Sequence, residues 1–181
     1  ASIVIVGESG AGKSTLSQEL AKHQRAKIYD DDSTMPLSTG DVLSAVPMGA
    51  ASRIRFDVAE RLGYTGRALF GYVGDKVALP HVGHSSPTPP LVAIFELNPQ
   101  SEGASGNGVI SIQTDRVTPV EAIPMIWKHI HTINTSQAQS ALRFSLAHQL
   151  SALPMYKVTY AQGIHTPHDV ATALMMRTMQ K

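Results

Sequence analysis

Eight residues near the start of the chain constrain its fold more than any other feature of the sequence. They match the P-loop pattern Gly-x-x-x-x-Gly-Lys-(Ser/Thr) at every specified position. They are Gly7, Glu8, Ser9, Gly10, Ala11, Gly12, Lys13 and Ser14. The preceding residues 3–6 are apolar and β-branched, which predicts a strand buried on both faces. Residues 15–23 favour a helix, so the pattern lies between a strand and a helix, the context that it requires.

The residue types in this pattern predict an anion-binding loop. Small residues let successive backbone N–H groups converge on one point, and the N-terminus of the following helix adds partial positive charge. Lys13 is expected to reach the β- and γ-phosphates of a nucleoside triphosphate and to take part in catalysis, and the Ser14 hydroxyl is expected to bind Mg²⁺. The residues expected to bind the nucleotide are Gly7, Glu8, Ser9, Gly10, Ala11, Gly12, Lys13, Ser14 and Thr15.

Three adjacent aspartates, Asp30, Asp31 and Asp32, offer the carboxylates that phosphate chemistry requires. Residues 26–29 can form a second strand, and ligands collect at the carboxyl ends of strands in such sheets. We interpret Asp31 and Asp32 as catalytic residues, one of them the base, and Asp31 also as a metal ligand. Because neighbours on a strand point in opposite directions, both can face the phosphate only if a turn separates them. The alternative is an acidic turn that caps the following segment.

Further positive charge is needed where the transition state becomes more negative. The candidate arginines are Arg53, Arg55, Arg116 and Arg143. Of these, Arg55 and Arg116 are favoured for phosphate contact. A loop histidine, His81 or His84, is a candidate general base. The chain has no cysteine, so its histidines do not predict a zinc site.

The remaining strands are expected to be short. Between about residues 40 and 90, brief extended segments are separated by glycines and prolines, as in hairpins and turns. Residues 91–97 predict a buried strand, residues 109–114 a half-exposed strand, and residues 155–160 a further strand. The hairpin-rich middle favours a mixed sheet over a purely parallel one.

Three more helices are expected in the C-terminal half. One begins after Thr118 and extends to about residue 131, and one extends over residues 136–153 with Leu142 on its apolar face. The last begins after Thr166, and both threonines belong to capping boxes. Together these elements predict one α/β domain over residues 1–181, with a mixed sheet, flanking helices and the P-loop between the first strand and the first helix.

Composition excludes several classes of protein. The net charge of +1 gives no electrostatic reason to expect a nucleic acid or an anionic membrane as partner. No apolar run reaches the roughly 18 residues of a membrane span, and the first residues do not resemble a signal peptide. The lack of cysteine fits a reducing compartment, so a cytoplasmic location is expected. The sequence is compatible with a homo-oligomer.

With these segments in view, the chain resembles the HPr kinase/phosphorylase family and its short relatives. The resembling segments are residues 7–15, 29–32, 90–97 and 142–158. The resemblance implies a PEP-carboxykinase-like nucleotide-binding fold, ATP with Mg²⁺, and transfer of the γ-phosphate to a hydroxyl, often a serine on a protein or peptide. It also implies that Lys13 and Ser14 bind phosphate and metal, and that Asp31 and Asp32 supply a metal ligand and the catalytic base.

The chain departs from the family pattern in two respects. The family places strands and a histidine-bearing segment upstream of the P-loop, whereas only six residues precede Gly7 here. We interpret the chain either as a fragment or as a protein whose corresponding elements lie elsewhere. The Glu-x-Arg-Gly-hydrophobic-Gly signature of true HPr kinases is absent from the sequence. A short relative that acts on a hydroxyl other than that of HPr, such as the kinases of lasso-peptide clusters, is therefore favoured.

Two alternatives stay open. One is a small-molecule kinase of the gluconate or shikimate kind, which also pairs a P-loop with an early aspartate but has a parallel sheet. The other is a nucleotide-binding regulator that transfers phosphate only to water. The sequence has no guanine-specifying Asn-Lys-x-Asp motif, which argues against a GTPase switch.

Overall fold

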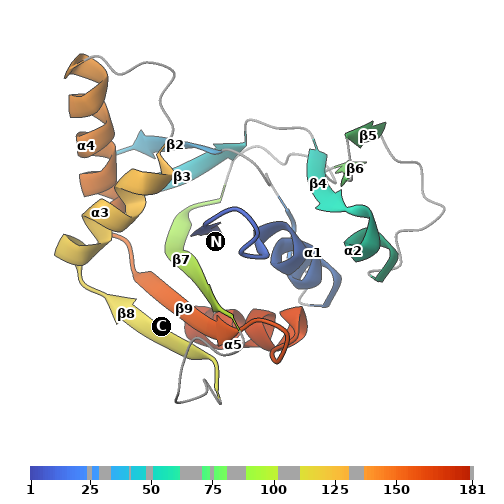
Figure 1. Cartoon of the computed structure of the whole chain (residues 1–181). Coiled ribbons are helices and arrows are strands. Elements are labelled where there is room, and N and C mark those ends of the chain that lie inside the picture. The colour runs from blue at the N-terminus through green and yellow to red at the C-terminus, as the bar shows by residue number, and fades with distance from the viewer. Residues whose placement is uncertain are drawn as a thin grey trace.

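Four strands form the central sheet, in the order β1-β7-β9-β8 (Figure 1). β1 (Ser2–Gly7) pairs in parallel with β7 (Leu91–Gln100), and β7 pairs in parallel with β9 (Met155–Ala161). β8 (Gln113–Val117) pairs antiparallel with β9, so the sheet is mixed. This computed structural model describes residues 1–23, 26–28, 34–40, 42–47, 51–61, 71–73, 76–80, 89–101, 111–130 and 137–179.

Helices cover both faces of this sheet, which makes a three-layer α/β arrangement (Figure 1). α1 (Lys13–His23) and α5 (Pro167–Met179) pack on one face, where Leu16 and Leu174 meet Phe95 in one apolar cluster. α3 (Pro119–His129) and α4 (Gln137–Ser151) cover the other face, where Ile126 and Leu150 join a second cluster. β7 is buried on both faces because its apolar run supplies side chains to both clusters in alternation.

Two smaller sheets account for the middle of the chain. β2 (Thr34–Thr39) and β3 (Val42–Pro47) form an antiparallel hairpin. The second sheet has the order β4-β6-β5, from β4 (Ala51–Arg55), β6 (Lys76–Pro80) and β5 (Gly71–Val73). α2 (Phe56–Arg61) follows β4 directly, and its buried Val58 packs with Ile54 and Val77.

The predicted fold class is confirmed at the level of a single α/β domain with a mixed sheet and flanking helices. Both predicted capping boxes are present. Thr118 Oγ1 accepts a hydrogen bond from the Glu121 amide, and the Glu121 carboxylate accepts one from the Thr118 amide. Thr166 and Asp169 exchange the corresponding bonds at the start of α5. The threonine hydroxyls also donate to these carboxylates, and together with the threonine amides they hold the pKa values of Glu121 and Asp169 below their usual range.

Three local predictions were wrong or shifted. Of the strand predicted at residues 26–29, residues 26–28 are not strand, and the Ala26 amide donates to the Leu20 carbonyl of α1; residue 29 lies outside the described part of the chain. The strand expected at residues 109–114 is β8, which begins only at Gln113. Leu142 is 69% exposed rather than packed, because the N-terminal half of α4 stands clear of the central sheet (Figure 1).

Three of the described elements were not predicted, β2, the short strand β5 and the short helix α2. β2 is mostly exposed and contains a proline, so its strand conformation depends on pairing with β3 rather than on its own apolar pattern. None of the helices within the described ranges is long and apolar enough to cross a membrane.

Phe95 should be among the most costly core positions to truncate. Its side chain is fully buried and stacks on Tyr156 with ring centroids 5.2 Å apart. Phe95→Ala is expected to lower the free energy of unfolding by about 3–5 kcal/mol in urea denaturation. The exposed Leu142→Ala serves as control and should change it by less than about 0.5 kcal/mol. Similar losses in both variants would contradict this account of the core.

Candidate functional site

The glycine-rich loop connects the carboxyl end of β1 to the first turn of α1. Gly10 and Gly12 have φ angles of 83° and 82°, a left-handed conformation that residues with a Cβ rarely adopt. The helix begins at Lys13, and the Leu16 amide makes its first helical hydrogen bond, to the Gly12 carbonyl. The amides of the turn before Leu16 therefore have no acceptor within the helix, and they point towards the loop.

A glycine is needed at position 7 because the loop passes close to β7 there. A Cβ on Gly7 would lie 3.1 Å from the Leu97 carbonyl oxygen and 3.3 Å from the Ala11 Cβ. The parallel register pairs Gly7 with Leu97, so this contact is set by the central sheet itself. The beginning of the loop is thereby fixed to the neighbouring strand.

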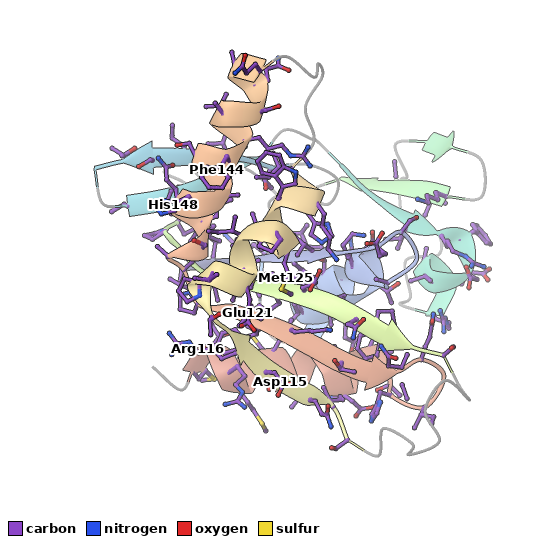
Figure 2. The ribbon with its side chains drawn as sticks, turned by 60° about the vertical axis from the view of Figure 1, so that its left-hand side comes forward. Asp115, Arg116, Glu121, Met125, Phe144 and His148 are labelled. Atoms are coloured by element: carbon purple, nitrogen blue, oxygen red, sulfur yellow. The ribbon has the colours of Figure 1, made fainter. Side chains whose placement is uncertain are left out.

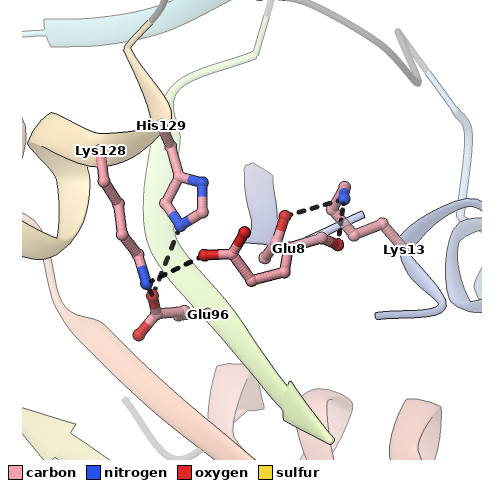
Figure 3. Close-up of polar contacts among 6 residues, drawn as sticks. Glu8, Lys13, Glu96, Lys128 and His129 are labelled. Atoms are coloured by element: carbon pink, nitrogen blue, oxygen red, sulfur yellow. Dashed lines mark hydrogen bonds and ion pairs between the residues drawn. The ribbon is translucent and has the colours of Figure 1, made fainter. Parts of the chain in front are cut away.

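Lys13 folds back over the loop that precedes it (Figure 3). Its Nζ donates to the carbonyl oxygens of Gly7 at 2.8 Å and Glu8 at 2.9 Å. An ammonium group has three donors. These two bonds hold the positive charge inside the curve of the loop and leave a third donor for an anion.

Tyr160 supports the loop from β9. Its hydroxyl donates to the Ala11 carbonyl oxygen at 2.6 Å, a contact between residues 149 positions apart in the chain. The ring is buried in the same apolar cluster as Ala11, and burial raises the pKa of the hydroxyl, which stays protonated and able to donate. The conformation of the loop thus depends on β9 as well as on β7.

A cluster of charged groups lies beside the loop (Figure 3). Glu96, at the level of Val6 on the neighbouring strand β7, is only 5% exposed. Its Oε1 accepts from Lys128 Nζ at 2.6 Å and lies 3.4 Å from His129 Nε2, both from the last turn of α3. Lys128 Nζ is also 3.7 Å from Oε1 of Glu8, a loop residue.

The protonation states in this cluster follow from its surroundings. Lys128 is charged near pH 7, and the hydrogen bond to Glu96 raises its pKa further. Burial lowers the pKa of His129 despite its carboxylate neighbour, so its ring is neutral near pH 7 and donates through Nε2. Glu96, Lys128 and His129 were not predicted as site residues. The available signal was a single acidic residue within an otherwise apolar strand, residues 91–97.

The sheet face that carries α3 and α4 becomes polar at the level of the loop. Three successive rows across the strands are Ile94–Met155–Val117, Glu96–Lys157–Asp115 and Asn98–Thr159–Gln113. The first row packs against the helices, whereas Lys157, Asp115 and Gln113 are exposed. Among the described residues, the helices pack on the apolar row, and the polar rows lie towards the carboxyl ends of β7 and β9.

The favoured arginines do not reach the loop. Arg55 forms an exposed ion pair with Asp57 at 3.0 Å. Arg116 lies on β8, at the opposite edge of the sheet from β1 and about 14 Å away at the usual strand spacing (Figure 2). Arg143 stacks 4.5 Å from the Trp127 ring centroid and donates to the Trp127 carbonyl, so it joins α4 to α3.

Several predicted site residues lie outside the described part of the chain. They are the aspartates Asp30, Asp31 and Asp32, the histidines His81 and His84, and the side chain of Arg53. Among the residues that the structure describes, no three Asp, Glu or His side chains come together as a metal site. Ser14, in the first turn of α1, is the predicted metal ligand that can be located.

Compared with protein-family models, with curated protein sequences and with solved structures, the chain shows no significant match. Its function is therefore inferred from the geometry of its own residues.

Removing the Tyr160 hydroxyl tests its support of the loop. Tyr160→Phe leaves the Ala11 carbonyl without this donor, so the free energy of unfolding should fall by about 1–2 kcal/mol. Tyr156→Phe is the matched control, because it removes a hydroxyl from the same strand away from the loop, and a smaller loss is expected. Equal losses in chemical denaturation would show that the bond to the loop contributes nothing specific.

The lowered pKa of His129 predicts that the free energy of unfolding depends on pH. Burial lowers its pKa in the folded state, so the unfolded chain binds a proton at higher pH than the folded chain does. As the pH falls through about 6.5, protonation favours the unfolded state and stability decreases until the pH has passed the folded-state pKa. His129→Gln should reduce this loss when unfolding is measured from about pH 7 downwards. His148→Gln, at an exposed position on α4, is the control and should leave the pH dependence unchanged. If His129→Gln also left the slope of unfolding free energy against pH unchanged, His129 would not be its source.

Proposed function

We propose that this chain is a Mg²⁺- and ATP-dependent kinase that transfers the γ-phosphate to a hydroxyl acceptor, most simply a serine on a protein or peptide. The observation that carries the proposal is the position of Lys13. Its ammonium group is held on the Gly7 and Glu8 carbonyls, inside a loop whose left-handed glycines lie at the N-terminus of α1. A cytoplasmic location and a PEP-carboxykinase-like fold belong to the same proposal.

Phosphate binding by this loop would use three sources of positive potential. The amides at the start of α1, which have no acceptor within the helix, offer hydrogen bonds, the helix dipole adds partial charge, and Lys13 adds a full charge. All three are held in place before a ligand arrives, by the pairing of Gly7 with Leu97 and by the bond from Tyr160 to Ala11. A preorganised site loses little entropy when it binds its ligand.

The residues present suit Mg²⁺ bound together with the nucleotide. Magnesium keeps several waters and needs only one or two protein ligands beside the phosphate oxygens. Ser14 would supply a hydroxyl and Asp31 a carboxylate, as expected from the sequence. When bound, the ion would neutralise charge that develops on the β- and γ-phosphate oxygens.

The proposed reaction is an in-line displacement at the γ-phosphorus. The acceptor oxygen forms a new bond to phosphorus while the bond from phosphorus to the β,γ-bridging oxygen breaks. ADP leaves with the electron pair of that bond, and the acceptor proton passes to the carboxylate of Asp31 or Asp32. Lys13 holds the β- and γ-phosphate oxygens throughout.

The mixed sheet supports this proposal over a small-molecule kinase of the gluconate or shikimate kind, for which a parallel sheet is expected. β8 runs antiparallel to β9, and the middle of the chain contains antiparallel strands. The same features favour the HPr-kinase-like resemblance, with its acceptor on a protein or peptide.

Two variants separate nucleotide binding from catalysis. Lys13→Ala should abolish turnover and strongly weaken Mg·ATP binding, because it removes the charge inside the loop. Asp31→Asn should lower turnover by about 10²–10⁴-fold with little effect on binding. Lys22→Ala, at an exposed position on α1, is the matched control for Lys13. Calorimetry measures binding, and transfer of label from radioactive ATP to the protein and metabolite fractions of a cell extract measures turnover.

The location of the label decides between acceptor classes. Label in a protein or peptide supports the proposal, label in a small sugar or acid points to a small-molecule kinase, and release of free phosphate alone points to an NTPase. Full activity in Lys13→Ala or Asp31→Asn would show that the site is misplaced.

A further inference from the structure

Lys128 lies between a buried carboxylate and the glycine-rich loop itself (Figure 3). Its Nζ is 2.6 Å from Glu96 Oε1 and 3.7 Å from Glu8 Oε1. The Glu96 side chain is 6% exposed, whereas that of Lys128 is 47% exposed and that of Glu8 is 81% exposed. The ammonium group is therefore held firmly by the buried Glu96 carboxylate. Its contact with the exposed Glu8 carboxylate of the loop is looser.

The position of Glu96 brings this ammonium group to the site. Glu96 pairs in register with Val6, and the next pair along the two strands is Leu97 with Gly7, the first loop residue. Lys128 and Lys13 thus contact the same loop residue, Lys128 through the Glu8 carboxylate and Lys13 through the Glu8 carbonyl oxygen. Two cations flank one loop residue.

The Glu8 carboxylate would repel a bound triphosphate if it were not neutralised. Lys128, protonated at neutral pH and with its pKa raised further by the hydrogen bond to Glu96, offsets part of this charge while it also pairs with Glu96. The third group that faces the ammonium, His129, is neutral near pH 7 because burial lowers its pKa. A triphosphate that enters the loop would compete with Glu8 for Lys128, while Glu96 would keep the side chain at the same place.

We propose that Lys128 is a second phosphate-directed cation of this site, positioned by Glu96, and that it exchanges its contact with Glu8 for the γ-phosphoryl group during transfer. This inference rests on the proposed kinase function. Lys128 donates hydrogen bonds to a γ-phosphate oxygen as the bond to the β,γ-bridging oxygen breaks, and it keeps its proton throughout. It takes the role for which Arg55 and Arg116 were considered from the sequence.

The neighbouring basic residues do not share this geometry. Lys157 pairs in register with Glu96 but lies on β9, one strand further from the loop, and its side chain is exposed. Arg116 is on β8, one strand further again. Lys157 therefore offers a matched control, since Lys157→Met changes the net charge by the same amount on the other side of Glu96.

The test compares two ligands that do not require the acceptor. Mg·ADP reports on ground-state binding, and Mg·ADP with aluminium fluoride, which mimics the transferred phosphoryl group, reports on the transition state. Lys128→Met should weaken binding of the aluminium fluoride complex by about tenfold or more and binding of Mg·ADP by less than about threefold. Lys128→Arg should retain most of the affinity, and Lys157→Met should bind both ligands like the wild type.

Glu96 needs its own control, because Lys128→Met leaves a buried carboxylate without its partner. The double variant Lys128→Met/Glu96→Gln removes both charges and should recover thermal stability while it still loses affinity for the aluminium fluoride complex. Recovery of that affinity in the double variant would overturn the proposal, as would equal losses for both ligands or an equal loss in Lys157→Met. A wild-type protein that binds neither ligand would instead refute the kinase function.

Discussion

The parallel pairing of β1 with β7 is the constraint on which the rest of the site depends. It brings Gly7 so close to the Leu97 carbonyl that a Cβ would have little space. It also pairs Glu96 with Val6, the residue immediately before the loop. The loop leaves the sheet at this point and enters α1 after two left-handed glycines. A different register would separate the loop from the charged groups on β7 and α3.

Charge around the loop is arranged in two parts. Lys13 is held by backbone carbonyls, which carry only partial charge and can yield a donor to a phosphate oxygen. Lys128 is held by carboxylates, one buried and one exposed. The exposed partner, Glu8, belongs to the loop, so Lys128 connects the loop to the last turn of α3. The neutral state of His129 leaves this balance unchanged near pH 7.

The parts of the structure that were predictable are those specified by neighbouring residues. The apolar run before Gly7, the glycine spacing of the loop and the capping boxes at Thr118 and Thr166 each depend on residues within about four positions. The apolar pattern of residues 136–153 predicted that Leu142 is packed, but it is exposed. An apolar pattern does not show whether another element covers that part of the helix. Residues 26–28 were likewise expected to be extended, but the Ala26 amide donates to the Leu20 carbonyl of α1 instead.

The sequence alone determined the loop, its lysine and the helix that follows, because their conformations depend on local sterics and local hydrogen bonds. Only the tertiary structure decided that Glu96, Lys128 and Tyr160 meet this loop. Glu96 and Lys128 are separated by about thirty residues, and Tyr160 lies 149 positions from its partner Ala11. These long-range contacts depend on strand order and register, which result from the packing of the whole core. They leave no periodic pattern in the sequence near the residues themselves.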